Sequence, residues 1–118
     1  MERWLLFPLR IPGGWAVRHN GLDAEVDERG QVLRVNDSKD LLWLVKLPPP
    51  DTQRYENAAD SQWREVHLDA GWYRDRFRVV LLDPDWDHVR RSAETADVQE
   101  LIRIIEAWLV DPFGRWPG

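Results

Sequence analysis

The chain has 118 residues, a formal net charge of −5 and no cysteine. The length fits one domain over residues 1–118, and the acidic balance argues against nucleic acid as the principal partner, because no basic surplus exists to displace counterions. The lack of cysteine excludes disulfides, thiolate metal sites and cysteine nucleophiles, and it is compatible with the reducing cytoplasm, where we place a soluble protein.

The N-terminal segment predicts two short strands. An apolar run, WLLF, begins at Trp4 and is stopped by Pro8. The run is too short for the apolar core of a signal peptide and far too short for a membrane span, so we expect a strand and no membrane contact. Gly13-Gly14 predicts a turn, and the WAVR segment that begins at Trp15 predicts the second strand.

The next segment predicts a β-meander. Asn20-Gly21 is a strong signal for a tight turn between paired strands. Apolar and acidic residues alternate from 22 to 26, as they do in a half-buried strand. Residues 27–30, DERG, predict the following turn, and residues 32–35 predict the returning strand.

The middle of the chain predicts further strands around a loop. Residues 41–47, LLWLVKL, fit a strand or a short helix, and their length and the three prolines that follow favour the strand. Residues 48–62 are polar and without periodicity, which predicts a surface loop. Alternation predicts a strand over 63–68, residues 69–71 predict a turn, and the almost wholly apolar residues 77–82 predict a central strand.

The period changes near the C-terminus, where apolar residues recur at helical spacing. They form one stripe: Val98, Leu101, Ile102, Ile105, Trp108 and Leu109. Ser92 or Thr95 can cap this helix, and Asp111-Pro112 ends it, so we expect a helix over about 95–110. The predicted fold class is α+β: a mostly antiparallel β-meander sheet of five or six strands, with the C-terminal helix packed on one face.

The acidic stretch DPDWDHVRRSAE resembles a calcium-binding EF-hand loop in its spacing. Positions 1, 3, 5 and 12 carry carboxylates: Asp83, Asp85, Asp87 and Glu94. Position 6, which needs glycine for a sharp turn, is His88, and the preceding residues predict a strand instead of a helix. Calcium binding is therefore not favoured.

Two other interpretations of this stretch remain open, and both can hold. In the first, Asp83-Pro84 ends a strand, Asp85 or Asp87 caps a short turn, and Trp86 anchors the loop on the core. In the second, the aspartates form an acidic patch with a tryptophan at its centre and bind a basic protein surface.

Other constellations give little support for catalysis. The histidines are far apart and lack zinc-ligand spacing, the serines lack a nucleophile elbow, and no glycine-rich phosphate loop is present. Residues 71–78, GWYRDRFR, interleave aromatic and basic side chains, a pattern that can stack on single-stranded nucleic acid. In a strand, however, Arg74, Arg76 and Arg78 fall on one solvated face, which is the interpretation we favour.

Residues 11–26, IPGGWAVRHNGLDAEV, resemble the opening of certain small, mostly uncharacterised bacterial proteins. Those proteins carry an Ile-Pro-x-Gly-Trp-x-Val-x-x-Asn signature followed by an acidic β-meander. The chain also resembles, in size and layout, the immunity proteins of bacterial polymorphic-toxin systems, which are acidic, cysteine-poor α+β domains without catalytic motifs. The resemblance implies an inhibitor that neutralises a cognate toxin by tight binding.

We therefore predict a non-enzymatic protein-binding domain that needs no cofactor or metal and recognises a partner with a basic surface. The predicted contact residues are Asp83, Asp85, Trp86 and Asp87. The alternative is a small-ligand-binding or enzymatic domain with a tryptophan-lined cleft, since eight tryptophans are many for this length. A concave pocket with convergent polar groups would favour the alternative, and a flat acidic face would favour the protein binder.

Overall fold

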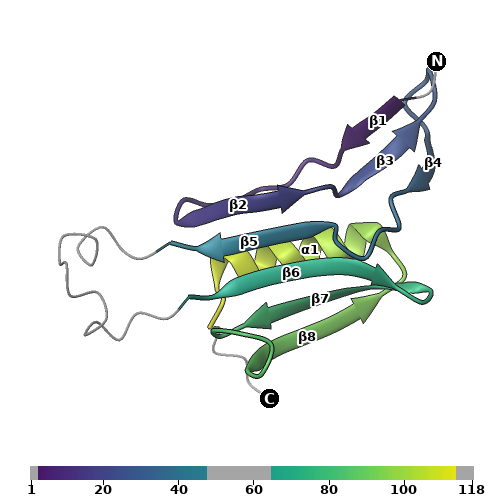
Figure 1. Ribbon diagram of the computed structural model, residues 1–118. Coiled ribbons are helices and arrows are strands. Elements are labelled where there is room, and N and C mark those ends of the chain that lie inside the picture. The colour runs from purple at the N-terminus through teal and green to yellow at the C-terminus, as the bar shows by residue number, and fades with distance from the viewer. Residues whose placement is uncertain (1–2, 48–64, 114–118) are drawn as a thin grey trace, which may run out of the picture.

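The computed structural model describes residues 3–47 and 65–113. These residues form two antiparallel β-sheets and one C-terminal helix, which confirms the predicted α+β class (Figure 1). The surface loop predicted at 48–62 lies outside the described residues.

Five strands form the larger sheet, and all neighbouring strands in it are antiparallel. In spatial order they are β2 (Trp15–Asn20), β5 (Leu42–Lys46), β6 (His67–Tyr73), β7 (Arg76–Leu82) and β8 (Val89–Thr95). The segment predicted as a central strand is β7, which lies between β6 and β8 and buries side chains on both faces. Strand β8 occupies the second half of the acidic stretch, where the polar sequence gives no strand signal.

A smaller sheet holds the N-terminal strands and projects from one end of the larger sheet (Figure 1). Its order is β1 (Arg3–Leu6), β3 (Asp23–Val26) and β4 (Val32–Val35). The predicted turn between β3 and β4 is confirmed. The Asp27 carboxylate accepts the backbone N–H groups of Arg29 and Gln31 at 2.8 and 2.9 Å, and Gly30 adopts a φ of +80°.

The tight turn predicted at Asn20-Gly21 is wrong, because β2 and β3 belong to different sheets. The Asn20 side chain accepts the N–H of Leu22 at 3.1 Å, and the Gly21 N–H donates to the Leu41 carbonyl at 2.6 Å. These bonds bend the chain from one sheet into the other and place Leu22 in the core, where it is 1% exposed. Burial of this leucine outweighs the local preference for a hairpin.

Helix α1 (Val98–Val110) packs across one face of the larger sheet. Its predicted apolar stripe is buried at five positions: Leu101, Ile102, Ile105, Trp108 and Leu109. The indole N–H of Trp15 donates to the Leu109 carbonyl at 3.0 Å and so ties β2 to the last helical turn. No helix in the described part of the chain is long and apolar enough to cross a membrane.

The residue that caps α1 differs from the prediction. Ser92 and Thr95 lie in β8, and the helix begins after Asp97, whose carboxylate accepts the N–H of Gln99 at 3.0 Å. Thr95 helps to hold the capping residue in place, because its hydroxyl oxygen accepts the Asp97 N–H at 3.1 Å. The chain leaves β8 in an extended conformation, so the cap falls later than the first available hydroxyl.

The hairpin between β6 and β7 turns at Arg74-Asp75, where Arg74 has a φ of +59°. The turn predicted at residues 69–71 is wrong, because those residues lie inside β6. The turn also removes Arg74 from the register of Arg76 and Arg78, so the three arginines do not share one strand face.

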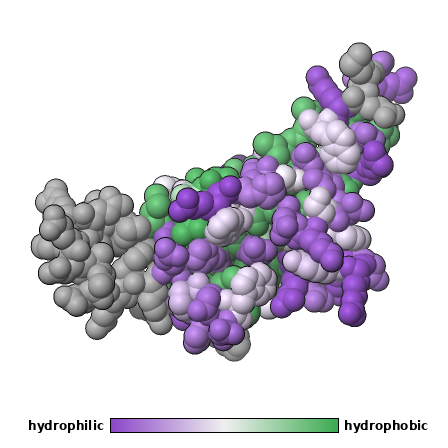
Figure 2. Space-filling model, in the orientation of Figure 1, coloured by the Kyte–Doolittle hydropathy of each residue, from purple (hydrophilic) through white to green (hydrophobic). Residues whose placement is uncertain are grey.

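The larger sheet has one face under the helix and one face without helical cover. Leu42 and Leu44 of β5 join the core beneath α1, whereas Trp43 between them points the other way and is 42% exposed. The helix lies behind the sheet in Figure 1, so the other face is turned to the viewer. We call it the open face, and Figure 2 shows it as mostly hydrophilic or intermediate, with scattered hydrophobic areas.

Candidate functional site

The centre of the open face is a row of cross-strand neighbours. Trp43 of β5 lies opposite Asp69 of β6, Asp69 opposite Val80 of β7, and Val80 opposite Ser92 of β8. His67, two residues before Asp69, occupies the same face. The pleat therefore gathers a tryptophan, a carboxylate and an imidazole on one side of the sheet.

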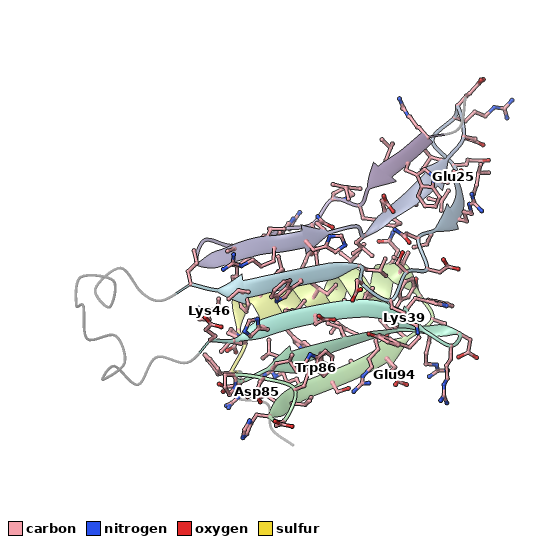
Figure 3. The ribbon with its side chains drawn as sticks, in the orientation of Figure 1. Glu25, Lys39, Lys46, Asp85, Trp86 and Glu94 are labelled. Carbon is pink, nitrogen blue, oxygen red and sulfur yellow. The ribbon has the colours of Figure 1, made fainter. Side chains whose placement is uncertain are left out.

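These residues line a cleft of about 300 Å³. The loop between β7 and β8 supplies its other wall, and the lining residues are Trp43, His67, Asp69, Leu82, Pro84, Asp85 and Trp86. We call this hollow the tryptophan cleft. Asp85 and Trp86 lie beside β6 and β7 in Figure 3. Trp86 is 55% exposed, so both tryptophans of the cleft present indole surface to solvent.

A second hollow adjoins the tryptophan cleft and shares Trp43 and Asp69 with it. Its other lining residues are His19, Asp40 and Leu42. Asp69 therefore stands between two hollows, and the open face is furrowed instead of flat.

Asp69 is the most perturbed carboxyl group of the open face. Burial, followed by the nearby negative charge of Asp40, raises the pKa of Asp69 from 3.8 to about 6, while His67 acts in the opposite direction. No side chain of the described residues donates a hydrogen bond to this carboxylate. The fold thus holds a half-buried carboxylate that receives no side-chain hydrogen bond from the described residues and whose charge is offset only in part by His67.

Gly71 explains how Asp40 comes so close to Asp69. A Cβ at residue 71 would collide with the carbonyl of Lys39, which passes directly against strand β6. On either side of this contact the Leu41 N–H donates to the Ala70 carbonyl at 2.9 Å, and the Trp72 N–H donates to the Ser38 carbonyl at 2.8 Å. The glycine predicted to form a turn therefore lets the segment before β5 dock on the sheet.

His67 is fixed by contacts to both ring nitrogens. The indole N–H of Trp43 donates to His67 Nδ1 at 3.0 Å, and Nε2 lies 3.2 Å from a carboxylate oxygen of Glu65. The ring also stacks on Trp43 with an interplanar angle of 25°. With Nδ1 as acceptor, the neutral ring carries its proton on Nε2 and orients the indole. Neither nitrogen is left to act as a base or a metal ligand.

The four residues predicted from sequence lie in the loop between β7 and β8, in different environments. Asp83 is 7% exposed, and its carboxylate lies 3.4 Å from the Arg90 guanidinium. Its N–H donates to the His88 carbonyl at 3.0 Å and closes the loop. Asp83 is therefore part of the loop's interior, which leaves Asp85, Trp86 and Asp87 as the exposed members of the predicted set.

Asp85 organises the tip of this loop. Its carboxylate accepts the Asp87 N–H at 3.0 Å and contacts His88 Nδ1 at 2.8 Å. The hydrogen bond from His88 lowers the pKa of Asp85, and the same bond raises the pKa of His88. Trp86, expected to anchor the loop on the core in one interpretation, instead lines the tryptophan cleft and is largely exposed.

Sequence reasoning missed Trp43, His67 and Asp69. Trp43 sits in an apolar run that predicts a wholly buried strand, and Asp69 sits in a triplet that predicts a turn. The available signal was weak: His67 and Asp69 are the polar positions of an alternation that continues through β6.

Residues 3–47 and 65–113 contain no cluster of metal ligands and no serine hydrogen-bonded to a histidine. No group of three or more His, Asp or Glu side chains there is arranged to hold a metal ion. The acidic stretch follows strand β7 and contains most of strand β8, whereas an EF-hand loop lies between two helices. The Ser38 hydroxyl donates to the Asn36 side chain at 2.7 Å and not to a histidine.

Comparison with models of protein families, with curated proteins and with solved structures finds no match for this chain.

Proposed function

We propose that the chain is a soluble, cytoplasmic protein-binding domain of the immunity type, an inhibitor that neutralises a cognate bacterial toxin without catalysis. One observation carries the proposal: two exposed tryptophans, Trp43 and Trp86, flank the half-buried carboxylate of Asp69 on the open face. Tryptophan is the residue most enriched at binding hot spots, where a buried aromatic anchor holds the complex.

The charge around the tryptophan cleft supports a basic partner. Asp40, Asp69 and Asp85 line the two hollows, and no lysine or arginine is among the described residues that line either of them. A negative rim attracts a positively charged surface, speeds the encounter and fixes the register of the complex. The net charge of −5 also attracts a basic partner.

The arrangement supports binding better than catalysis. His67 is the one imidazole of the tryptophan cleft, and both of its nitrogens contact neighbouring side chains. No serine, threonine or tyrosine is among the lining residues in the described part of the chain. His67, with both nitrogens engaged, is poorly placed to activate a nucleophile for acyl or phosphoryl transfer.

A second candidate function, binding of a small ligand, is favoured by the shape of the site. A concave cleft with polar groups was the feature expected for that alternative, and the tryptophan cleft has both. Its volume of about 300 Å³ is at the lower end of the range for small-molecule sites. A small organic cation is the ligand class that two indoles and a carboxylate would select.

Calorimetric titration against a toxin encoded beside the gene of this chain tests the proposal. We expect a one-to-one complex of nanomolar or tighter affinity that weakens as salt rises from about 0.1 to about 0.5 M. Trp86→Ala should weaken binding by about 2 kcal/mol, and Asp87→Lys should raise Kd about tenfold. Asp87 is chosen because Asp83 and Asp85 hold the loop together.

Glu28→Lys is the matched control, because it makes the same charge change at an exposed residue of the β3–β4 turn. It should bind like the wild type. Equal losses in Glu28→Lys and Asp87→Lys would show that only net charge matters. A metabolic operon around the gene, or no heat with the neighbouring toxin, would contradict the immunity role, and a small cation bound in the absence of any protein partner would favour the second candidate.

A further inference from the structure

We infer that the tryptophan cleft is a pocket for the guanidinium group of a single arginine, presented by the protein that binds the open face. The inference rests on the proposed function, since it names the side chain by which the partner would be recognised. Two features of the cleft lead to it: a carboxylate that receives no hydrogen bond from the described side chains, and two partly exposed indoles. No lysine or arginine is among the described residues that line the cleft.

The carboxylate supplies the charge and the geometry. Asp69 lines the tryptophan cleft, and none of the described side chains donates a hydrogen bond to it. A carboxylate accepts two parallel hydrogen bonds from a guanidinium, and such bidentate pairs are among the strongest polar contacts. Asp85, on the opposite wall, is already bonded to His88 and adds negative potential without competing for the same contact.

The indoles of the cleft supply flat surfaces for a cation. Elsewhere in this chain, tryptophan rings already bind cations in this way. Arg34 lies 5.4 Å from the ring centre of Trp4, and Arg91 lies 5.8 Å from that of Trp108. Trp43 and Trp86 have no such cation among the described residues, although they are 42% and 55% exposed. Trp86, and the part of Trp43 that the His67 ring does not cover, therefore offer indole surface on which a planar cation can stack.

Arginine fits these features better than lysine. Its guanidinium is planar, is weakly hydrated and presents a rigid fork of donors, so it can stack on an indole and bind a carboxylate together. An ammonium group is a strongly hydrated point charge and gains less from either contact. The cleft volume of about 300 Å³ suits one side chain.

Nuclear magnetic resonance of the full chain tests the pocket with a defined probe, N-acetyl-arginine methylamide. The indole N–H signals of Trp43 and Trp86 are assigned from the variants Trp43→Phe and Trp86→Phe. We expect saturable shifts of both signals with millimolar affinity. The neutral isostere N-acetyl-citrulline methylamide should produce no shift, and the lysine analogue should bind several-fold more weakly.

Asp69→Asn keeps the shape of the side chain and removes its charge. This variant should bind the arginine probe about tenfold more weakly while its other backbone signals stay in place. Glu28→Gln, a matched charge removal at an exposed residue of the β3–β4 turn, should bind the probe almost as well as the wild type. No shift in the wild type, equal shifts with citrulline or lysine, or undiminished binding by Asp69→Asn would each overturn the inference.

The result separates this inference from the proposed function. Toxin binding that persists without any response to the arginine probe would reject the pocket and keep the inhibitor. A response to the probe in a chain that binds no toxin would reject the inhibitor and keep the pocket.

Discussion

Asp69 shows how the position of one residue in a sheet decides its chemistry. The same carboxylate in an exposed turn, where the sequence pattern places it, would ionise normally. In β6 it is half-buried beside Asp40, and its pKa rises to about 6. Folding therefore keeps a charge at this point at a cost in stability, which is a common feature of binding and active sites.

This cost predicts a specific pH dependence. Asp69 holds its proton up to about pH 6 in the folded protein but only to about 3.8 in the unfolded chain. The folded state binds more protons between these values, so the free energy of unfolding falls as pH rises through this window. The full shift corresponds to about 3 kcal/mol, which solvent screening at a half-buried group reduces to about 1 kcal/mol.

Asp69→Asn should therefore be more stable than the wild type by about 1 kcal/mol above pH 6, and equally stable below about pH 4. Urea denaturation at the two pH values measures the difference. Asp40→Asn is the companion variant. Removing the negative charge of Asp40 should lower the pKa of Asp69, because burial then remains as the main cause that raises it. An Asp69→Asn variant that is less stable at neutral pH would show that the carboxylate has a stabilising partner.

Gly71 makes a second prediction at the residue scale. Gly71→Ala should lower the free energy of unfolding by about 2–4 kcal/mol, because the new methyl group meets the Lys39 backbone, which cannot move without breaking its neighbours' hydrogen bonds. Gly13→Ala is the matched control, since nothing lies within 4 Å of a Cβ at that position. Chemical denaturation of both variants should show a large loss only for residue 71.

At the scale of elements, α1 and β7 follow from sequence because their signals are long and consistent. The apolar stripe of α1 and the apolar run of β7 point to the same structures as the tertiary packing does. Asn20-Gly21 fails as a hairpin signal because the burial of Leu22 and the bond to Leu41 are long-range effects. Local patterns of two or three residues cannot include such contacts.

The candidate site was only partly predictable for the same reason. The loop at Asp85, Trp86 and Asp87 can be recognised in the sequence, because a tryptophan stands there between two aspartates. The other half of the tryptophan cleft comes from Trp43 and Asp69, which are brought together by the register of β5 and β6. Register depends on pairing across the sheet, and no feature of either segment alone reveals it.

The cap of α1 gives a prediction that belongs to this scale. Asp97→Ala should cost about 1 kcal/mol, because the N–H of Gln99 loses its partner and the helix N-terminus loses a negative charge. Ser92→Ala should be nearly neutral, since Ser92 lies exposed in β8. Thermal unfolding of the two variants measures the contrast, and a larger loss for Ser92→Ala would contradict the assigned cap.

At the scale of the whole molecule, the larger sheet is asymmetric: the helix covers one face (Figure 1), and the open face carries the two hollows with their acidic and aromatic lining. The smaller sheet offers a different surface, with Trp4, Leu5 and Leu6 exposed on β1. A partner that used the smaller sheet would be held by apolar contacts and would be insensitive to the charge of Asp69.

The most direct test of the central claim, that the open face is the binding surface, is a chemical-shift map of the isotope-labelled chain with its unlabelled toxin. We predict that the signals perturbed most strongly are the indoles of Trp43 and Trp86 and the amides around Asp69 and Asp85, while the outer side of α1 at Glu100 and Val110 is unchanged. Perturbation confined to α1 or to the smaller sheet would contradict the account.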